Sequence, residues 1–147
     1  ELERMDTLEP EESEGMREIK FRGKRLDNGE WVYGAFVPDA LEQTHSDMVS
    51  WGFIRRYNGS KSEMIEVDRK TVGEYTGLKD KNGKEIYEGD ILIGKENRSI
   101  HVVTVVWDRS GYWTYRGYNK ELRGGYLTDL RRVEVIGNIY ENPELLE

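Results

Sequence analysis

The chain has 147 residues, of which 36% are hydrophobic and 35% are charged, and its net charge is −7. This length suits one domain or two small domains that share a core. The chain contains no cysteine, which excludes disulfides, thiolate zinc sites and cysteine nucleophiles. No run approaches the ~18 apolar residues of a membrane-spanning helix and no signal peptide is recognisable, so we expect a soluble, cytoplasmic protein.

The negative charge is concentrated in the first residues. Residues 1–15 hold seven acidic residues and one basic residue, whereas the rest of the chain holds 22 acidic and 21 basic residues. A short stretch with so many acids and so few apolar side chains is typical of a solvated segment. We therefore interpret residues 1–15 as an acidic tail or an artificial leader outside the folded unit.

The first half of the chain predicts short strands and tight turns. Sixteen glycines and nine tyrosines already favour a β protein. Alternating apolar and charged residues predict a strand over residues 18–22, and Asn28-Gly29 then favours a hairpin turn. Further strands are predicted over residues 31–37, 51–57, 64–67 and 72–75, with a connection over residues 39–49.

The second half continues this pattern. Residues 78–87 predict a polar ribbon with a two-residue, left-handed turn at Asn82-Gly83. The next strands are expected over residues 91–93, 100–107, 112–116 and 133–139, with a loop over residues 117–125. Asn142-Pro143 predicts a single helical turn near the end of the chain. The expected fold class is mainly β with little helix, in a thin barrel or sandwich whose core is rich in aromatic residues.

Three stretches of the sequence, Met16–Arg22, Thr76–Ile91 and Val135–Leu146, together resemble the YopX family of bacteriophage and prophage proteins. The resemblance implies a C-terminal small β-barrel or roll of the Src-homology type over residues 71–147, with an additional N-terminal β portion over residues 16–70 in one compact unit. It also implies a phage gene expressed in the bacterial host. It implies no established activity, so it transfers no site residue.

Four residues of the middle stretch are interpreted as structural. Asn82 and Gly83 form the hairpin turn, Gly89 permits a tight backbone before a strand, and Asp90 hydrogen-bonds nearby amides. The alternative interpretation gives the corner from Glu88 to Asp90 a role in binding.

Catalytic and metal-binding patterns are weak. The two histidines, His45 and His101, are 56 positions apart, and His45 is interpreted as a polar loop residue rather than half of a catalytic pair. Five residues separate Gly77 from Gly83, and Glu85 stands where a phosphate loop needs Ser or Thr. We therefore expect no enzymatic activity, no metal and no cofactor.

A basic and aromatic segment is the strongest candidate for binding. Residues 109–132 combine six bases and two acids with five interleaved aromatic residues. Arginines for phosphate and flat rings for base stacking are typical of single-strand binding. Trp113 itself is predicted to be buried, since alternate aromatic residues of a strand usually enter the core. The candidate surface comprises Trp113, Tyr115, Arg116, Tyr118, Lys120 and Arg123.

Two classes of function follow from this segment. Aromatic residues and arginine dominate protein–protein hot spots, so we expect a non-enzymatic phage or prophage accessory protein that acts through an unknown protein partner or self-association in the host cytoplasm. The alternative is a single-stranded nucleic-acid-binding module that uses residues 109–132. That alternative is disfavoured because the remainder of the chain lacks a broad basic stripe. No membrane contact is expected.

Overall fold

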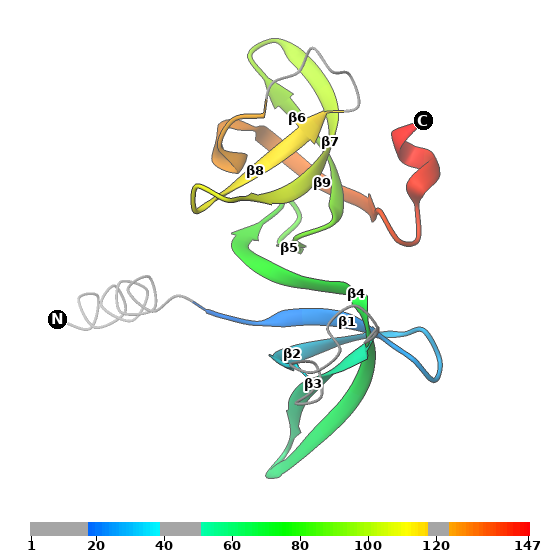
Figure 1. Cartoon of the computed structure of the whole chain (residues 1–147). Coiled ribbons are helices and arrows are strands. Elements are labelled where there is room, and N and C mark those ends of the chain that lie inside the picture. The colour runs from blue at the N-terminus through cyan, green and yellow to red at the C-terminus, as the bar shows by residue number, and fades with distance from the viewer. Residues whose placement is uncertain (1–17, 39–50, 118–123) are drawn as a thin grey trace, which may run out of the picture.

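In the part of the chain that the structure describes, the fold consists of β-strands with two short 3₁₀ turns, which confirms the mainly β prediction. The computed structural model describes residues 18–38, 51–117 and 124–147 (Figure 1). The connection predicted over residues 39–49 and the tail over residues 1–15 lie outside these residues. The elements are β1 (Phe21–Arg25), β2 (Trp31–Val37), β3 (Trp51–Asn58), β4 (Lys61–Lys79), β5 (Glu85–Tyr87), β6 (Asp90–Glu96), β7 (Ser99–Asp108), β8 (Tyr112–Gly117), η2 (Leu127–Asp129), β9 (Arg131–Asn138) and η3 (Pro143–Leu146).

The N-terminal lobe is built from β1, β2, β3 and the first part of β4. These strands pair in the order β1-β2-β3-β4, and β4 also pairs with β1, so the sheet curls back on itself. Its strands alternate between buried and exposed residues, as period-two patterning requires. The core of this lobe contains Val32, Ile54, Ile65 and Val67, with Phe21, Phe36 and Val72 packed against it.

The C-terminal lobe holds a second and larger core. Its four-stranded sheet has the order β8-β7-β6-β9, and the hairpin of β4 and β5 packs beside it. The buried core contains Ile86, Leu92, Val103, Val105, Tyr115, Leu127 and Leu130. Tyr115 is the one aromatic residue of this buried cluster, so the described core is mainly aliphatic and the core rich in aromatic residues expected from the composition is not found.

Strand β4 connects the two lobes without a linker. It runs for 19 residues, pairing with β3 through residues 61–68, with β1 through residues 67–74 and with β5 near its end. Figure 1 shows this strand passing from the lower lobe into the upper one. The two strands predicted at 64–67 and 72–75 are thus one continuous strand. Between them, Thr71 bonds to β1, because its Oγ1 accepts a 2.9 Å hydrogen bond from the Lys24 amide. The expected boundary between residues 70 and 71 falls inside β4.

The turn at Asn82-Gly83 differs in type from the prediction. Gly83 has φ +82°, whereas Asn82 is not among the residues with positive φ. Asp80 and Lys84 pair across a three-residue loop, in which the Gly83 amide donates to the Asp80 carbonyl oxygen. This is the pattern of a type I turn followed by one left-handed residue. The Asp80 carboxylate accounts for the difference, because it accepts hydrogen bonds from the amides of Asn82 and Lys84 and so favours the longer loop.

A buried ion pair joins the lobes. Arg22 Nη2 of β1 lies 2.7 Å from Asp90 Oδ1 at the start of β6, and both residues are at most 5% exposed. The guanidinium lies over the rings of Trp31 and Tyr87, at 4.5 and 5.0 Å from their centroids. Burial raises the pKa of Asp90, and the lowering by Arg22 and by the hydrogen bond from the Tyr87 amide does not fully offset it. The junction is therefore held by charge and aromatic stacking.

Candidate binding pocket

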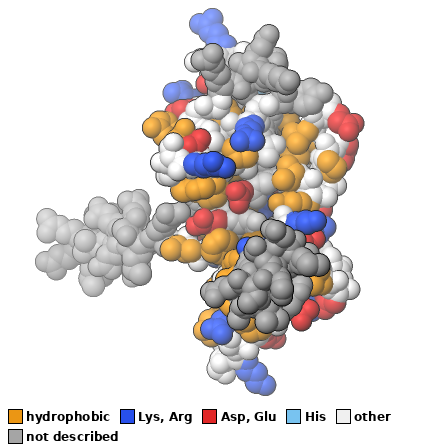
Figure 2. Space-filling model, viewed as in Figure 1, with side chains coloured by type: hydrophobic (Ala, Val, Ile, Leu, Met, Phe, Trp, Pro, Cys, Tyr) orange, Lys and Arg blue, Asp and Glu red, His pale blue; other side chains and the backbone are white. Residues whose placement is uncertain are grey.

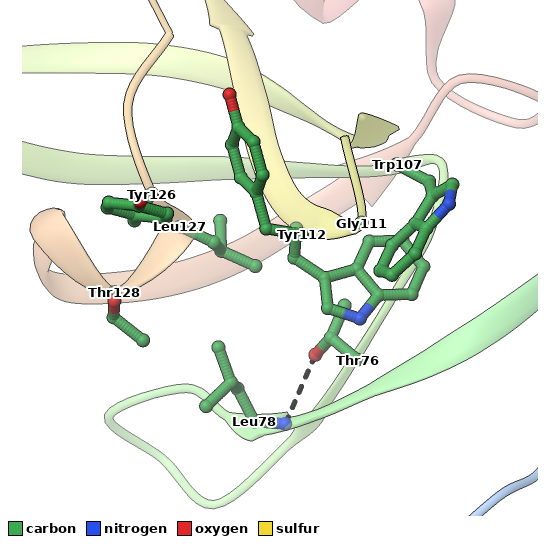
Figure 3. Close-up of a pocket in the computed structure, with 9 residues that line it drawn as sticks. Thr76, Leu78, Trp107, Gly111, Tyr112, Tyr126, Leu127 and Thr128 are labelled. Carbon is green, nitrogen blue, oxygen red and sulfur yellow. Dashed lines mark hydrogen bonds between the residues drawn. The ribbon is translucent and has the colours of Figure 1, made fainter. Parts of the chain in front are cut away.

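An aromatic pocket opens on the C-terminal lobe, where the β7–β8 hairpin meets η2 and β4. It has a volume of about 320 Å³. Figure 3 shows its lining side chains converging from the β7–β8 hairpin, from η2 and from the end of β4. The lining comprises Thr76, Leu78, Trp107, Gly111, Tyr112, Trp113, Tyr126, Leu127 and Thr128. No Lys, Arg, Asp or Glu is among these described lining residues, so the walls offer rings, methyl groups and hydroxyls.

Two edge-to-face ring pairs form the aromatic walls. The ring centroids of Trp107 and Trp113 are 4.8 Å apart, and those of Tyr112 and Tyr126 are 5.0 Å apart. The first pair follows from the hairpin register, in which Trp107 lies opposite Trp113. Trp107 remains 43% exposed and Tyr126 59% exposed. Large exposed aromatic surfaces beside a hollow are typical of an interaction site.

The polar groups of the pocket are few. The Thr76 hydroxyl donates to the Ile86 carbonyl oxygen at 2.8 Å and accepts from the Leu78 amide at 3.1 Å (the dashed line in Figure 3). The indole Nε1 of Trp113 is buried and has no hydrogen-bond partner among the described residues. Buried donors nearly always find an acceptor, so this orphan N–H is a polar group that an occupant or a water molecule could satisfy.

The predicted candidate surface is only partly brought together here. Trp113 lines the pocket and also packs against the core, while Arg116 lies exposed on β8 outside the lining. Tyr118, Lys120 and Arg123 lie outside the described residues.

Tyr115 requires a correction. It is fully buried in the core, because it points to the opposite face of β8 from its exposed neighbour Arg116. Its hydroxyl donates to Glu96 Oε2 at 2.9 Å, and burial together with this carboxylate raises its pKa to about 12. It is therefore a core residue and offers no surface to a ligand.

Sequence reasoning missed most of the pocket. Tyr112 and Tyr126 lie within the basic and aromatic segment but were not singled out, and Trp107 lies just before it. A signal for Trp107 was present, since a tight turn over residues 108–111 places it opposite Trp113. Thr76 and Leu78 carry no such local signal, because the end of β4 reaches the pocket only through the long-range fold.

The four residues interpreted as structural lie away from this pocket. Asn82 and Gly83 form the hairpin loop described above. Gly89 has φ +89°, and a Cβ there would lie 3.2 Å from the Tyr140 ring. Asp90 accepts the Tyr87 amide hydrogen bond at 2.8 Å, as its role at a corner predicts.

Arrangements for other chemistry are absent from the described part of the chain. There, no three His, Asp or Glu side chains gather as metal ligands. His45 lies outside the described residues, and His101 is a half-buried residue of β7. Nor does any described helix have the length and apolarity needed to cross a membrane. Charges of both signs are interspersed on the face drawn in Figure 2, without a continuous basic stripe.

Comparisons with known proteins agree with this architecture. A solved structure, the crystal structure of protein EF1440 from Enterococcus faecalis, is similar at 26% sequence identity with a TM-score of 0.52, covering 90% of this chain and 100% of that one. No curated protein matches the chain. A family model described as YopX protein matches residues 20–147. Since this match spans both lobes and all nine described strands, the chain belongs to the YopX family.

Proposed function

We propose that this protein is a non-enzymatic interaction module that binds an extended peptide segment of a partner protein in the aromatic pocket. The observation that carries the proposal is the uncharged lining with its two aromatic pairs, open to solvent beside Trp107 and Tyr126. Trp and Tyr are the residues most enriched in protein–protein hot spots. In keeping with the family, we place this activity in a phage or prophage accessory protein that works in the cytoplasm of a bacterial host.

An extended peptide suits the pocket better than a folded surface or a nucleic acid. Aromatic-lined grooves receive extended and polyproline segments, whose carbonyl groups make no internal hydrogen bonds and remain free to accept. Trp113 belongs to the lining, and its unpaired indole N–H is a donor that such a carbonyl could satisfy. A nucleic acid would need cations beside the rings to neutralise its phosphates, and the described lining holds none.

Selection of binding peptides from a random library tests the proposal. The wild-type protein would be immobilised and panned, and the affinity of the enriched peptides would be measured by fluorescence titration. We expect Trp107→Ala to weaken binding by about tenfold or more, which corresponds to ~1.4 kcal/mol, because truncating a hot-spot ring typically costs this much. A matched control is Tyr57→Ala, since Tyr57 is a 72% exposed aromatic residue of the other lobe and should leave the affinity unchanged.

Two results would contradict the proposal. One is a set of peptides whose binding survives Trp107→Ala and Tyr126→Ala. The other is tight binding of a single-stranded oligonucleotide that Trp107→Ala abolishes in a stably folded variant, which would establish the nucleic-acid alternative. In that case the affinity should fall with salt at a log–log slope of roughly −0.7 for each neutralised phosphate.

A further inference from the structure

Arg132 has an unusual backbone conformation. Its φ is +53°, in the left-handed region that glycine favours and bulky residues rarely adopt. Among the described residues only one other non-glycine residue, Asn97, has positive φ, and asparagine tolerates that region far better than arginine does. A strained residue that the surrounding structure maintains is a reason to look for a function at that point.

A β-bulge in β9 imposes this conformation. Ile93 of β6 pairs with Glu134, and Lys95 pairs with Arg131, so Arg132 and Val133 together oppose the single residue Gly94. Gly94 suits the bulge, because a Cβ there would lie only 3.0 Å from the Val133 side chain. Bulges of this kind redirect a side chain relative to the regular strand. Here the bulge brings Arg132 into the lining of a surface hollow.

The hollow has a volume of about 280 Å³ and lies between β6, β7, β9 and the β4–β5 loop. It is separate from the aromatic pocket, with which it shares no lining residue. Its lining comprises Lys81, Ile93, Gly94, Lys95, Ile100, Arg132 and Glu134. Three cationic side chains from three segments thus share the lining with two isoleucines, of which Ile100 is 62% exposed.

Two of these cations are available for a ligand. Lys81 Nζ lies 3.2 Å from Glu134 Oε2, so one base of the lining forms an ion pair with the one acid of the lining. Lys95 and Arg132 form no ion pair with another described residue. The lining therefore carries a net charge of +2, counting three bases and one acid.

We propose that this hollow binds the phosphate group of a small phosphomonoester. A phosphomonoester carries about −1.5 to −2 charges at neutral pH, which matches the charge of the lining. The planar guanidinium of Arg132 can bind two phosphate oxygens at once, and Lys95 contributes a point charge. The exposed side chain of Ile100 and the half-buried side chain of Ile93 would contact the organic part of the ligand. A free phosphate ion would lack that second contact and should bind more weakly.

Titration of the full chain with three probes tests this site. Adenosine monophosphate, inorganic phosphate and adenosine would each be added to isotope-labelled protein, and amide shifts would be followed by NMR. We expect shifts at Lys95, Arg132 and Ile100 with adenosine monophosphate, weaker binding of phosphate and no binding of adenosine. Equal, millimolar binding of phosphate and sulfate with no gain from the nucleoside would indicate an adventitious ion only and would overturn the proposal.

Arg132→Gly separates a binding role from a structural one. Glycine adopts φ +53° without strain, so this variant should melt at the same temperature as the wild type or higher, while its affinity for adenosine monophosphate falls by about tenfold. Lys95→Ala should also weaken binding without unfolding the chain. Arg109→Ala, in the turn between β7 and β8, is the charge-matched control. Unchanged affinity in both Arg132→Gly and Lys95→Ala would refute the site.

Discussion

At the scale of single residues, Asp80 shows how one carboxylate fixes a loop and joins it to a distant strand. It is 7% exposed, and its two oxygens accept hydrogen bonds from the amides of Asn82, Lys84 and Val135 at 2.8–3.0 Å. The first two shape the β4–β5 loop, and the third ties that loop to β9, 55 positions along the chain. Burial raises the pKa of Asp80, but these donors outweigh it, and the pKa lies below its usual 3.8.

We predict that Asp80→Asn lowers the free energy of unfolding by ~1–3 kcal/mol, because an amide nitrogen replaces one acceptor and leaves a backbone donor unpaired. Since the folded pKa is depressed, this stabilisation is present above the unfolded pKa and is lost as pH falls through the folded value. Urea unfolding from about pH 5 downwards should therefore show the wild type losing more stability than the variant. Asp27→Asn, which alters an exposed carboxylate paired with Arg25, should have little effect at neutral pH.

The corrected turn leads to a second prediction. Gly83→Val should destabilise the chain by more than ~1 kcal/mol, because a β-branched residue is strained at φ +82°. Asn82→Ala should be nearly neutral, since Asn82 does not have positive φ; a two-residue left-handed turn would make both positions sensitive. Thermal melts of the two variants distinguish these cases. If both variants lost the same stability, the turn would be of the two-residue, left-handed type.

At the scale of elements, the sequence was most informative where structure is local. Period-two alternation predicted β2, β7 and β8 to within one residue at each boundary, because side-chain alternation is imposed by each strand alone. The strand predicted over residues 18–22 begins and ends three residues later, as β1. It divided β4 in two, since the change of partner from β3 to β1 depends on contacts far along the chain. The bulge at Arg132 carried no sequence signal, because arginine is not the residue that a left-handed position normally selects.

The candidate site follows the same rule. The sequence of residues 109–132 indicates a cluster of aromatic side chains, but composition does not predict which of these rings enter the core. Strand alternation places Tyr115 inside and Arg116 outside. Trp113 packs against the core and also lines the pocket, because the pocket lies at the edge of the core. The walls supplied by β4 and η2 become known only from the tertiary structure.

At the scale of the whole molecule, the junction of the lobes depends on Arg22 and Asp90. Removing one member of a buried pair leaves the other charge uncompensated. We predict that Asp90→Asn costs ~3–5 kcal/mol, although the amide oxygen can still accept from Tyr87. Arg22→Met should be less damaging in acid than at neutral pH, because the raised pKa of Asp90 lets it lose its charge there.

A double-mutant cycle measures this coupling. In guanidinium unfolding, the Arg22→Met, Asp90→Asn double variant should be more stable than the sum of the two single losses implies, by ~0.5–3 kcal/mol. Strict additivity would show that each residue acts independently of the other. Lys20→Met provides a comparison with a less buried ion pair at the same junction. Lys20 Nζ lies 2.6 Å from Glu85 Oε2, and this pair is more exposed to solvent than the pair of Arg22 and Asp90.

The continuity of β4 also determines how the chain can be divided. A cut between residues 70 and 71 leaves the β3 pairing in the first fragment, but it separates β1 from its partners Gly73 and Glu74 in the second. Each fragment then exposes strand edges that only the other can cover. We expect fragments 16–70 and 71–147 to aggregate when expressed alone and to reassemble when expressed together. The two fragments could therefore serve as a split protein. If each were fused to a different chain, reassembly of the fragments would report that the two fused chains are close together.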